Sequence, residues 1–98
     1  MKKTDLLIVC PAKFGGWAMK NPTIAEIGHK QNGVTEMRMR NSVGWTVEFY
    51  TKDPDDALAY LAELIATETG RVSLETSAMR DLIVPRAAYF GNEDEGDE

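Results

Sequence analysis

Apolar and polar side chains alternate along two segments in the middle of the chain. Across residues 34–40, two methionines take every second position and charged side chains lie between them. Residues 45–51 repeat the pattern, with Trp45, Val47 and Phe49 at the apolar positions. Because successive side chains of a β-strand point to opposite faces of a sheet, this alternation predicts two strands that each bury one face.

Two turns that end in glycine, Gln31–Gly33 and Ser42–Gly44, connect these strands to each other and to residues 23–30. We treat both as three-residue hairpin loops, because glycine accepts the positive φ that the last position of such a loop requires. Lys30 then faces Val34. The register pairs each inward side chain with another: Ile27 with Met37, Ala25 with Met39, Met39 with Val47, and Met37 with Phe49.

The alternative for the first turn is a two-residue loop at Asn32–Gly33. That loop places Ile27 opposite Arg38, and a slip of one residue exchanges the two faces of a strand. We therefore favour the three-residue loops and predict a three-stranded antiparallel meander.

The polar face of this meander carries a row of charges. Arg38 lies between Glu26 and Glu48, so we expect it to be paired with carboxylates. Arg40 faces Thr46 and has no carboxylate directly opposite. We therefore expect Arg40 to be the cation that is freer to bind a ligand.

An amphipathic helix is predicted after the meander. Asp53 can cap its first turn, Pro54 suits the first helical position, and Gly70 provides the stop. We expect the helix to cover the apolar face of the sheet. Its apolar stripe consists of Ala57, Leu58, Tyr60, Leu61, Leu64 and Ile65.

Weaker patterns flank this central unit. Leu6–Cys10 is an apolar run typical of a buried strand, and residues 72–76 and 82–84 are candidates for a second hairpin. Pro85 indicates a sheet edge or a strand end, and residues 87–90 can pack as a final short segment. Together the patterns predict one compact α+β domain over residues 1–90. It has an antiparallel sheet of five to six strands, in the order β-β-β-β-α-β-β, with one amphipathic helix on one face.

Charge is distributed unevenly along the 98 residues, which carry a net charge of −5. Residues 1–40 hold 7 basic and 3 acidic residues, whereas residues 41–90 hold 4 basic and 8 acidic ones. Residues 91–98 hold 5 acidic residues and no apolar side chain, which predicts a disordered acidic tail. The rest of the chain is therefore neutral, which disfavours strong non-specific binding to DNA.

Few side chains are available for catalysis. With one cysteine and one histidine, the chain has no internal disulfide and no multi-histidine or all-cysteine metal site. Cys10 ends an apolar run and is expected to be an inert core thiol, and His29 is expected to be structural. We therefore expect no enzyme activity, no metal and no cofactor. The longest apolar run is too short for a membrane span or a signal peptide, so we expect a cytoplasmic protein that binds no membrane.

The segment Pro11–Pro22 is the best candidate for a binding loop. Aromatic side chains and a methionine lie there between lysines, a combination found where proteins stack single-stranded bases and in protein interfaces. The alternative is that Phe14 and Trp17 fold back into the core. With Arg40 added, the candidate residues for binding protein or nucleic acid are Lys13, Phe14, Trp17, Met19, Lys20 and Arg40.

The function that we favour is a small non-enzymatic protein-binding protein, an inhibitor or adaptor that occludes a larger partner such as a nucleic-acid-handling complex. In size and character, though in no motif, the chain resembles the anti-CRISPR proteins of phages and mobile elements. Carboxylates would then contact the partner. The candidates are Glu63, Glu68, Glu75, Glu93, Asp94 and Glu95.

Two other functions are compatible with the sequence. The order of three strands, a helix and two strands resembles that of OB-fold domains. The acidic end resembles that of bacterial and phage single-strand-binding proteins, without their hydrophobic tip. A single-stranded nucleic-acid-binding protein is therefore the first alternative. The second is an assembly subunit that adds strands to a partner, or to a second copy in a homodimer, through a sheet edge near Leu6–Cys10 or Val84–Pro85.

Overall fold

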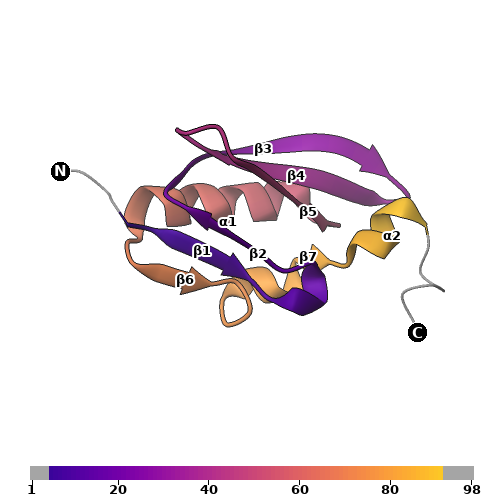
Figure 1. The fold of residues 1–98 in the computed structure, drawn as a ribbon. Coiled ribbons are helices and arrows are strands. Elements are labelled where there is room, and N and C mark those ends of the chain that lie inside the picture. Colours follow the sequence, from indigo (N-terminus) through magenta and orange to yellow (C-terminus); the bar gives the residue numbers. More distant parts are fainter. Residues whose placement is uncertain (1–4, 92–98) are drawn as a thin grey trace.

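The computed structural model describes residues 5–91, which fold into two β-sheets, one long helix and several short helical turns. The predicted α+β class is confirmed, but the strands divide between two sheets instead of forming one. Figure 1 shows the two sheets as layers, with the long helix packed beside them and the second helix at the far end. The elements are β1 (Leu7–Cys10), η1 (Ala12–Phe14), β2 (Trp17–Lys20), β3 (Pro22–Gln31), β4 (Val34–Asn41), β5 (Thr46–Thr51), α1 (Pro54–Thr67), β6 (Arg71–Ser73), η2 (Ala78–Asp81), β7 (Ile83–Val84) and α2 (Arg86–Phe90).

Strands β3, β4 and β5 form the predicted meander, in a four-stranded sheet of order β3-β4-β5-β7. All the predicted inward pairs are present, and Arg38 pairs with both Glu26 and Glu48. Met37, Met39 and Phe49 are almost fully buried. The period of two therefore identified both the strands and the face that is buried.

The first turn of the meander differs from the prediction. Gln31 pairs with Val34, so Asn32 and Gly33 form a two-residue turn. Both turn residues have positive φ, 56° and 77°, as a hairpin turn of this length requires. The prediction of a three-residue loop at residues 31–33 is wrong.

A β-bulge compensates for the shorter turn. The register shifts between Ile27 and Lys30, so the inward residues stay inward although the turn has one residue fewer. Gly28 lies within this shift. A Cβ at Gly28 would lie 2.8 Å from Glu36 Oε1 and 3.1 Å from the Glu36 carbonyl oxygen. The bulge therefore favours a residue without a side chain.

The second turn is the predicted three-residue loop. The N–H of Asn41 donates to the carbonyl of Trp45, and Gly44 has a φ of 99°. Two side chains predicted to point inward are nevertheless exposed, Trp45 by 70% and Ile27 by 43%. Trp45 lies just before β5 begins, beside the turn, and Ile27 lies on the edge strand β3, so neither is covered on both sides.

The second sheet has the order β2-β1-β6, and it uses the segment predicted to be a binding loop. Residues 17–20 form β2, which pairs antiparallel with β1. Strand β6 pairs with β1 in parallel, whereas β7 pairs with β5 in the other sheet. The predicted second hairpin is therefore wrong. Leu74 and Met79 lie between β6 and β7 and are fully buried, so the connection adds to the core instead of forming an exposed turn.

Helix α1 confirms the predicted stripe, with Ala57, Leu61 and Leu64 buried. The cap differs from the prediction, because the Asp53 side chain makes no capping hydrogen bond. Instead, the N–H of Asp53 donates to Oγ1 of Thr51 over 3.0 Å. The helix is followed by Gly70, whose positive φ of 83° allows the chain to turn into β6.

Both sheets and α1 enclose the main core. A second, smaller cluster consists of Val34, Tyr50 and Tyr89, and it joins α2 to the meander. The carbonyl of Tyr89 also accepts hydrogen bonds from the side-chain amides of Gln31 and Asn32. The buried residues of the main core are Leu6, Ile8, Cys10, Met19, Met37, Met39, Phe49, Ala57, Leu61, Leu64, Leu74, Met79 and Ile83.

Candidate binding groove along strand β5

Strand β5 has an open edge. On its other side β5 pairs with β4 along its whole length, but β7 pairs only with Tyr50 and Thr51. Of the residues that the structure describes, none pairs with Thr46–Glu48 on the side away from β4. An unpaired strand edge is a template on which another extended segment can pair.

The alternation of hydrogen bonds shows which backbone groups are available. Asn41 bonds to Trp45, so every second residue from Trp45 onward faces β4. The N–H and C=O groups of Thr46 and Glu48 therefore point to the open side. The next residue in this series, Tyr50, pairs with Val84 of β7 in the same direction.

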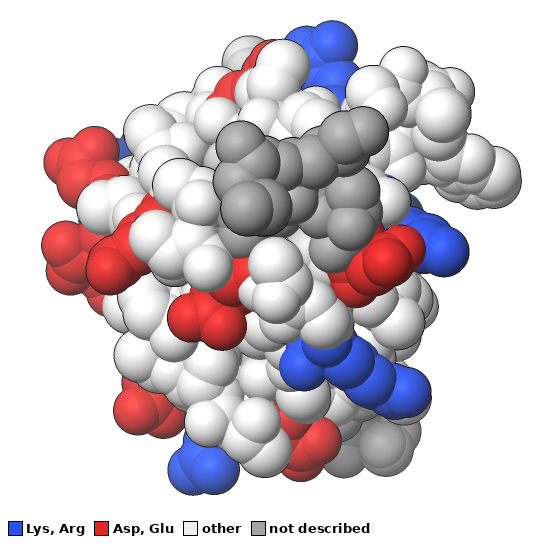
Figure 2. All heavy atoms as spheres, turned by 90° about the vertical axis from the view of Figure 1, so that its left-hand side faces the viewer, with Lys and Arg blue, Asp and Glu red and all other residues white. Residues whose placement is uncertain are grey.

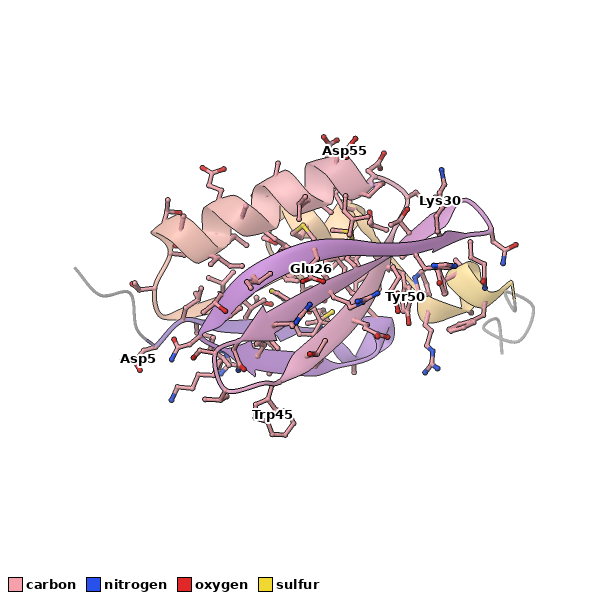
Figure 3. The ribbon with its side chains drawn as sticks, turned by 90° about the horizontal axis from the view of Figure 1, so that it is seen from above. Asp5, Glu26, Lys30, Trp45, Tyr50 and Asp55 are labelled. Atoms are coloured by element: carbon pink, nitrogen blue, oxygen red, sulfur yellow. The ribbon has the colours of Figure 1, made fainter. Side chains whose placement is uncertain are left out.

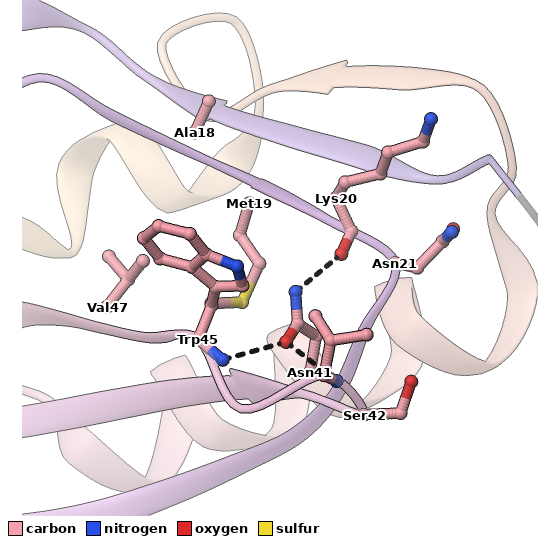
Figure 4. A pocket seen from close by; sticks show the side chains of 9 residues that line it. Ala18, Met19, Lys20, Asn21, Asn41, Ser42, Trp45 and Val47 are labelled. Carbon is pink, nitrogen blue, oxygen red and sulfur yellow. Dashed lines mark hydrogen bonds between the residues drawn. The ribbon is translucent and has the colours of Figure 1, made fainter.

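A hollow of about 470 Å³ lies between the start of this edge and β2. Figure 4 shows the indole of Trp45 beside Met19 in this hollow, with Lys20 and Asn21 at its rim. The Asn41 side chain joins the two walls, because its Nδ2 donates to the Lys20 carbonyl over 3.0 Å. The lining residues are Ala18, Met19, Lys20, Asn21, Asn41, Ser42, Val43, Trp45 and Val47.

Trp45 and Val43 give this hollow an exposed apolar rim. Their exposed fractions are 70% and 76%, unusually high for side chains of this size. Oδ1 of Asn41 accepts hydrogen bonds from the N–H groups of Val43 and Trp45, over 3.2 and 3.0 Å. This side-chain bonding holds the turn in place. Figure 3 shows Trp45 projecting away from the strands.

A second hollow, of about 540 Å³, continues along the same edge toward α2. Val47 borders both hollows, so we treat them as one surface, the β5 groove. Arg86 of α2 lies over the ring of Phe90, 5.1 Å from its centre, in a cation–π contact. The lining residues are Phe14, Gly15, Trp17, Glu36, Thr46, Val47, Glu48, Tyr50, Arg86 and Phe90.

Glu36 and Glu48 form a carboxylate pair in the second hollow. Both carboxylates line this hollow, close enough for the negative charge of Glu36 to act on Glu48. Burial, followed by the charge of Glu36, raises the pKa of Glu48, and Arg38 and Arg86 oppose this shift only in part. Arg38 Nη2 lies 3.6 Å from Glu36 Oε1, which is too far for a hydrogen bond. Arg38 and Glu36 thus form an ion pair without a close hydrogen bond.

The structure brings four of the six predicted binding residues to the β5 groove. Met19 and Lys20 line the first hollow, and Phe14 and Trp17 line the second. Met19 is buried, and the Trp17 ring stacks on Phe49 with 6.0 Å between the ring centroids. These two side chains thus also belong to the core, as the alternative interpretation of the segment expected.

The prediction for Arg40 is wrong. Its guanidinium forms an ion pair with Glu26, whereas Arg38 is 3.9 Å from that carboxylate. The physical reason is that a long side chain reaches its diagonal neighbour across a strand pair as well as the residue directly opposite. Arg40 is therefore not the freer cation, and it does not line either hollow.

The remaining predicted contacts lie elsewhere. Lys13 lies in η1, within the segment that borders the second hollow. Glu63, Glu68 and Glu75 are exposed, on α1 and in the turns that follow α1 and β6, and none lines either hollow. The acidic tail with Glu93, Asp94 and Glu95 lies outside the described residues.

Trp45, Glu36 and Glu48 are among the groove residues that the sequence did not identify as binding residues. Trp45 was assigned to the core because it continues the alternation of β5. The available signal was Asn41, since an asparagine at the start of a turn often bonds to the backbone that follows it. The proximity of Glu36 and Glu48 had no local signal, because it depends on the diagonal between two strands.

The other sheet edges that were predicted as pairing sites are less suitable for binding a partner strand. Strand β1 is the central strand of its sheet, so the expected edge at Leu6–Cys10 does not exist. Strand β7 is an edge strand, as expected near Val84–Pro85, but it spans only Ile83–Val84.

Residues 5–91 contain no group of three or more His, Cys, Asp or Glu side chains placed to hold a metal ion. Burial raises the pKa of the Cys10 thiol to about 11, so little thiolate exists at neutral pH. No described helix is both long and apolar enough to cross a membrane. The chain matches no protein-family model, and neither the curated proteins nor the solved structures include one with significant similarity to it.

Proposed function

We propose that this chain is a non-enzymatic protein-binding protein of the inhibitor or adaptor type, acting in the cytoplasm, which binds an extended segment of a larger protein in the β5 groove. The observation that supports this most directly is the open edge at Thr46–Glu48, beside a hollow with an exposed tryptophan. Backbone pairing provides affinity for a strand, and pockets beside the edge provide selectivity for its side chains. By covering a segment that the partner needs, such a protein inhibits the partner or links it to another.

The charge of the chain agrees with a protein partner more than with nucleic acid. The net charge is −5, and Figure 2 shows Lys and Arg side chains separated from one another by uncharged and acidic residues on the face in view. Nucleic-acid binding draws most of its affinity from clusters of phosphate contacts. The described strands also form two sheets, in contrast to the single barrel of an OB fold.

Affinity capture from the source cells tests this proposal. Trp45→Ala removes the exposed aromatic side chain, and Thr46→Pro removes an outward N–H without touching the bonds to β4. Ile24→Ala is the matched control, because Ile24 is also an exposed apolar side chain, 48% accessible, but lies on β3 outside the groove. We expect the true partner to bind wild type and Ile24→Ala, and to lose roughly thirtyfold in affinity with Trp45→Ala, as for an interface hot spot of about 2 kcal/mol. Capture that both groove variants leave unchanged would overturn the proposal.

One observation supports the alternative of single-stranded nucleic acid. The exposed indole of Trp45 lies in the same hollow as Lys20, and an aromatic face beside a cation can stack a base. Titration with oligo-dT at low salt, followed by tryptophan fluorescence, separates the two functions. Quenching that Trp45→Ala abolishes supports nucleic acid, and no change up to tens of micromolar protein excludes it.

A further inference from the structure

We propose, building on the function above, that the partner segment pairs antiparallel with β5 and carries a basic residue opposite Glu48, apolar residues at the two inward positions, and an acidic residue beyond them toward Lys20. The inference rests on the charges at the two ends of the β5 groove and on the register of its open edge.

The basic position follows from the carboxylate pair. Glu48 and Glu36 both line the second hollow, and the negative charge of Glu36 acts on Glu48. Arg40 is engaged with Glu26, Arg38 lies 3.6 Å from Glu36, and Arg86 lies over the ring of Phe90. A Lys or Arg side chain from the partner would bind between the two carboxylates of this hollow, where its positive charge would offset their mutual repulsion.

The apolar positions follow from the pleat. In an added strand, the residue opposite Glu48 shares its outward face, and the next residue, opposite Val47, points to the inward face. The residue opposite Thr46 points outward again, and the one opposite Trp45 points inward. Both inward side chains therefore approach the hollow that Met19, Val47 and Trp45 line.

The acidic position follows from the other end of the groove. Lys20 is the one charged residue among those that line the first hollow. Its backbone carbonyl is taken by Asn41, but its side chain is exposed at the rim. An antiparallel segment reaches this end after passing Trp45. We infer the antiparallel direction because antiparallel pairs are about two to three times as common as parallel pairs and slightly more stable per residue.

The resulting pattern is basic, apolar, polar, apolar, polar, acidic. The probe is a capped peptide containing Lys-Val-Thr-Leu-Thr-Asp between glycines, and its control is the charge-swapped peptide Asp-Val-Thr-Leu-Thr-Lys. Binding is measured by calorimetry and by Trp45 fluorescence at low salt. We expect the probe to bind roughly tenfold more tightly than the swapped peptide, because two favourable ion pairs replace two repulsive pairs.

Two variants assign this preference to the groove. Glu48→Lys is expected to reverse the order of the two peptides. Glu63→Lys makes the same change of charge on α1, outside both hollows, and is expected to preserve the order. Thr46→Pro is expected to weaken both peptides, because it blocks pairing with the edge.

Three results would overturn the inference. The first is equal binding of the two peptides, and the second is that neither binds at millimolar concentration. The third is that wild type prefers the swapped peptide and Glu48→Lys removes this preference. Light scattering that shows a dimer disrupted by Thr46→Pro would mean that a second copy occupies the edge, and oligo-dT that displaces the probe would indicate nucleic acid. If the capture experiment finds a partner that depends on Trp45 while the peptides do not discriminate, the proposed function stands and this inference fails.

Discussion

Replacing Gly28 with alanine tests how the bulge in β3 is built. The added Cβ would lie 2.8 Å from Glu36 Oε1, 3.0 Å from Arg38 Nη2 and 3.1 Å from the Glu36 carbonyl oxygen. The first two atoms end flexible side chains and can move. The carbonyl belongs to the backbone of β4, which pairs with β3 on one side and β5 on the other, so it can yield only by distorting the sheet.

The expected magnitude combines two opposing effects. Overpacking of this kind costs about 1–3 kcal/mol. The φ of Gly28 is not in the left-handed region, so alanine also restricts the unfolded chain and recovers about 0.4–1 kcal/mol. We therefore expect Gly28→Ala to lower the free energy of unfolding by about 1 kcal/mol and the Tm by about 4–8 °C.

Urea denaturation followed by tryptophan fluorescence measures this change, and the m-value should stay constant. Glu36→Ala provides the background that separates the contacts. If the carbonyl dominates, as the geometry indicates, Gly28→Ala costs nearly as much in that background as in wild type. A Gly28→Ala protein that is as stable as wild type, or more stable, would refute the account of the bulge.

Four further predictions follow from the core and the groove. Leu61→Ala, at a fully buried position, is expected to cost about 2–5 kcal/mol in urea denaturation, and a loss below 1 kcal/mol would contradict the assigned core. Trp17→Phe removes a buried Nε1 that has no hydrogen-bond partner among the described residues, so relief of about 1–3 kcal/mol of desolvation should offset most of the lost packing; a cost as large as that of Trp17→Ala would argue against it. Cys10 should react with iodoacetamide at pH 8 about a hundredfold more slowly than an ordinary thiol, because its pKa is about 11 instead of 9.0; the reaction of folded protein is compared with that in urea. The pKa of Glu48 is raised on folding, so the folded state binds the proton more tightly and this contribution to stability is lost as pH rises above 4.5 toward the raised value. Across that range the Tm of wild type should therefore fall relative to that of Glu48→Gln, and parallel Tm curves would contradict the raised pKa of Glu48.

The sequence predicted the meander well because the alternation that marks the buried face of each strand is contained within a few neighbouring residues. The alternation around Met37 and Met39 defines one face whatever the rest of the chain does. The apolar stripe of the helix around Leu61 was equally predictable, because residues on one face of a helix are only three or four positions apart in the sequence. The pairing at Ile27 was correct even though the predicted turn was wrong, because matching the apolar faces constrains the register more strongly than the turn does.

The candidate site was only partly predictable. The segment around Trp17 and Lys20 was identified from composition, and it does border the groove. The register predicts a free cation at Arg40 because no carboxylate lies directly opposite it, whereas Glu26 reaches it along the diagonal. The alternation predicts that Trp45 is buried, because it is separated from the buried Phe49 by an even number of positions.

The sequence by itself determined the strands of the meander, the helix and the side chains that each of them buries, because period and capping act over a few residues. Only the tertiary structure decided that β6 joins β1 while β7 joins β5, and that β5 is left open at Thr46–Glu48. Pairing between strands that are distant in sequence depends on how the whole chain fills its core, and no local period encodes it. The groove exists at the place where this pairing ends.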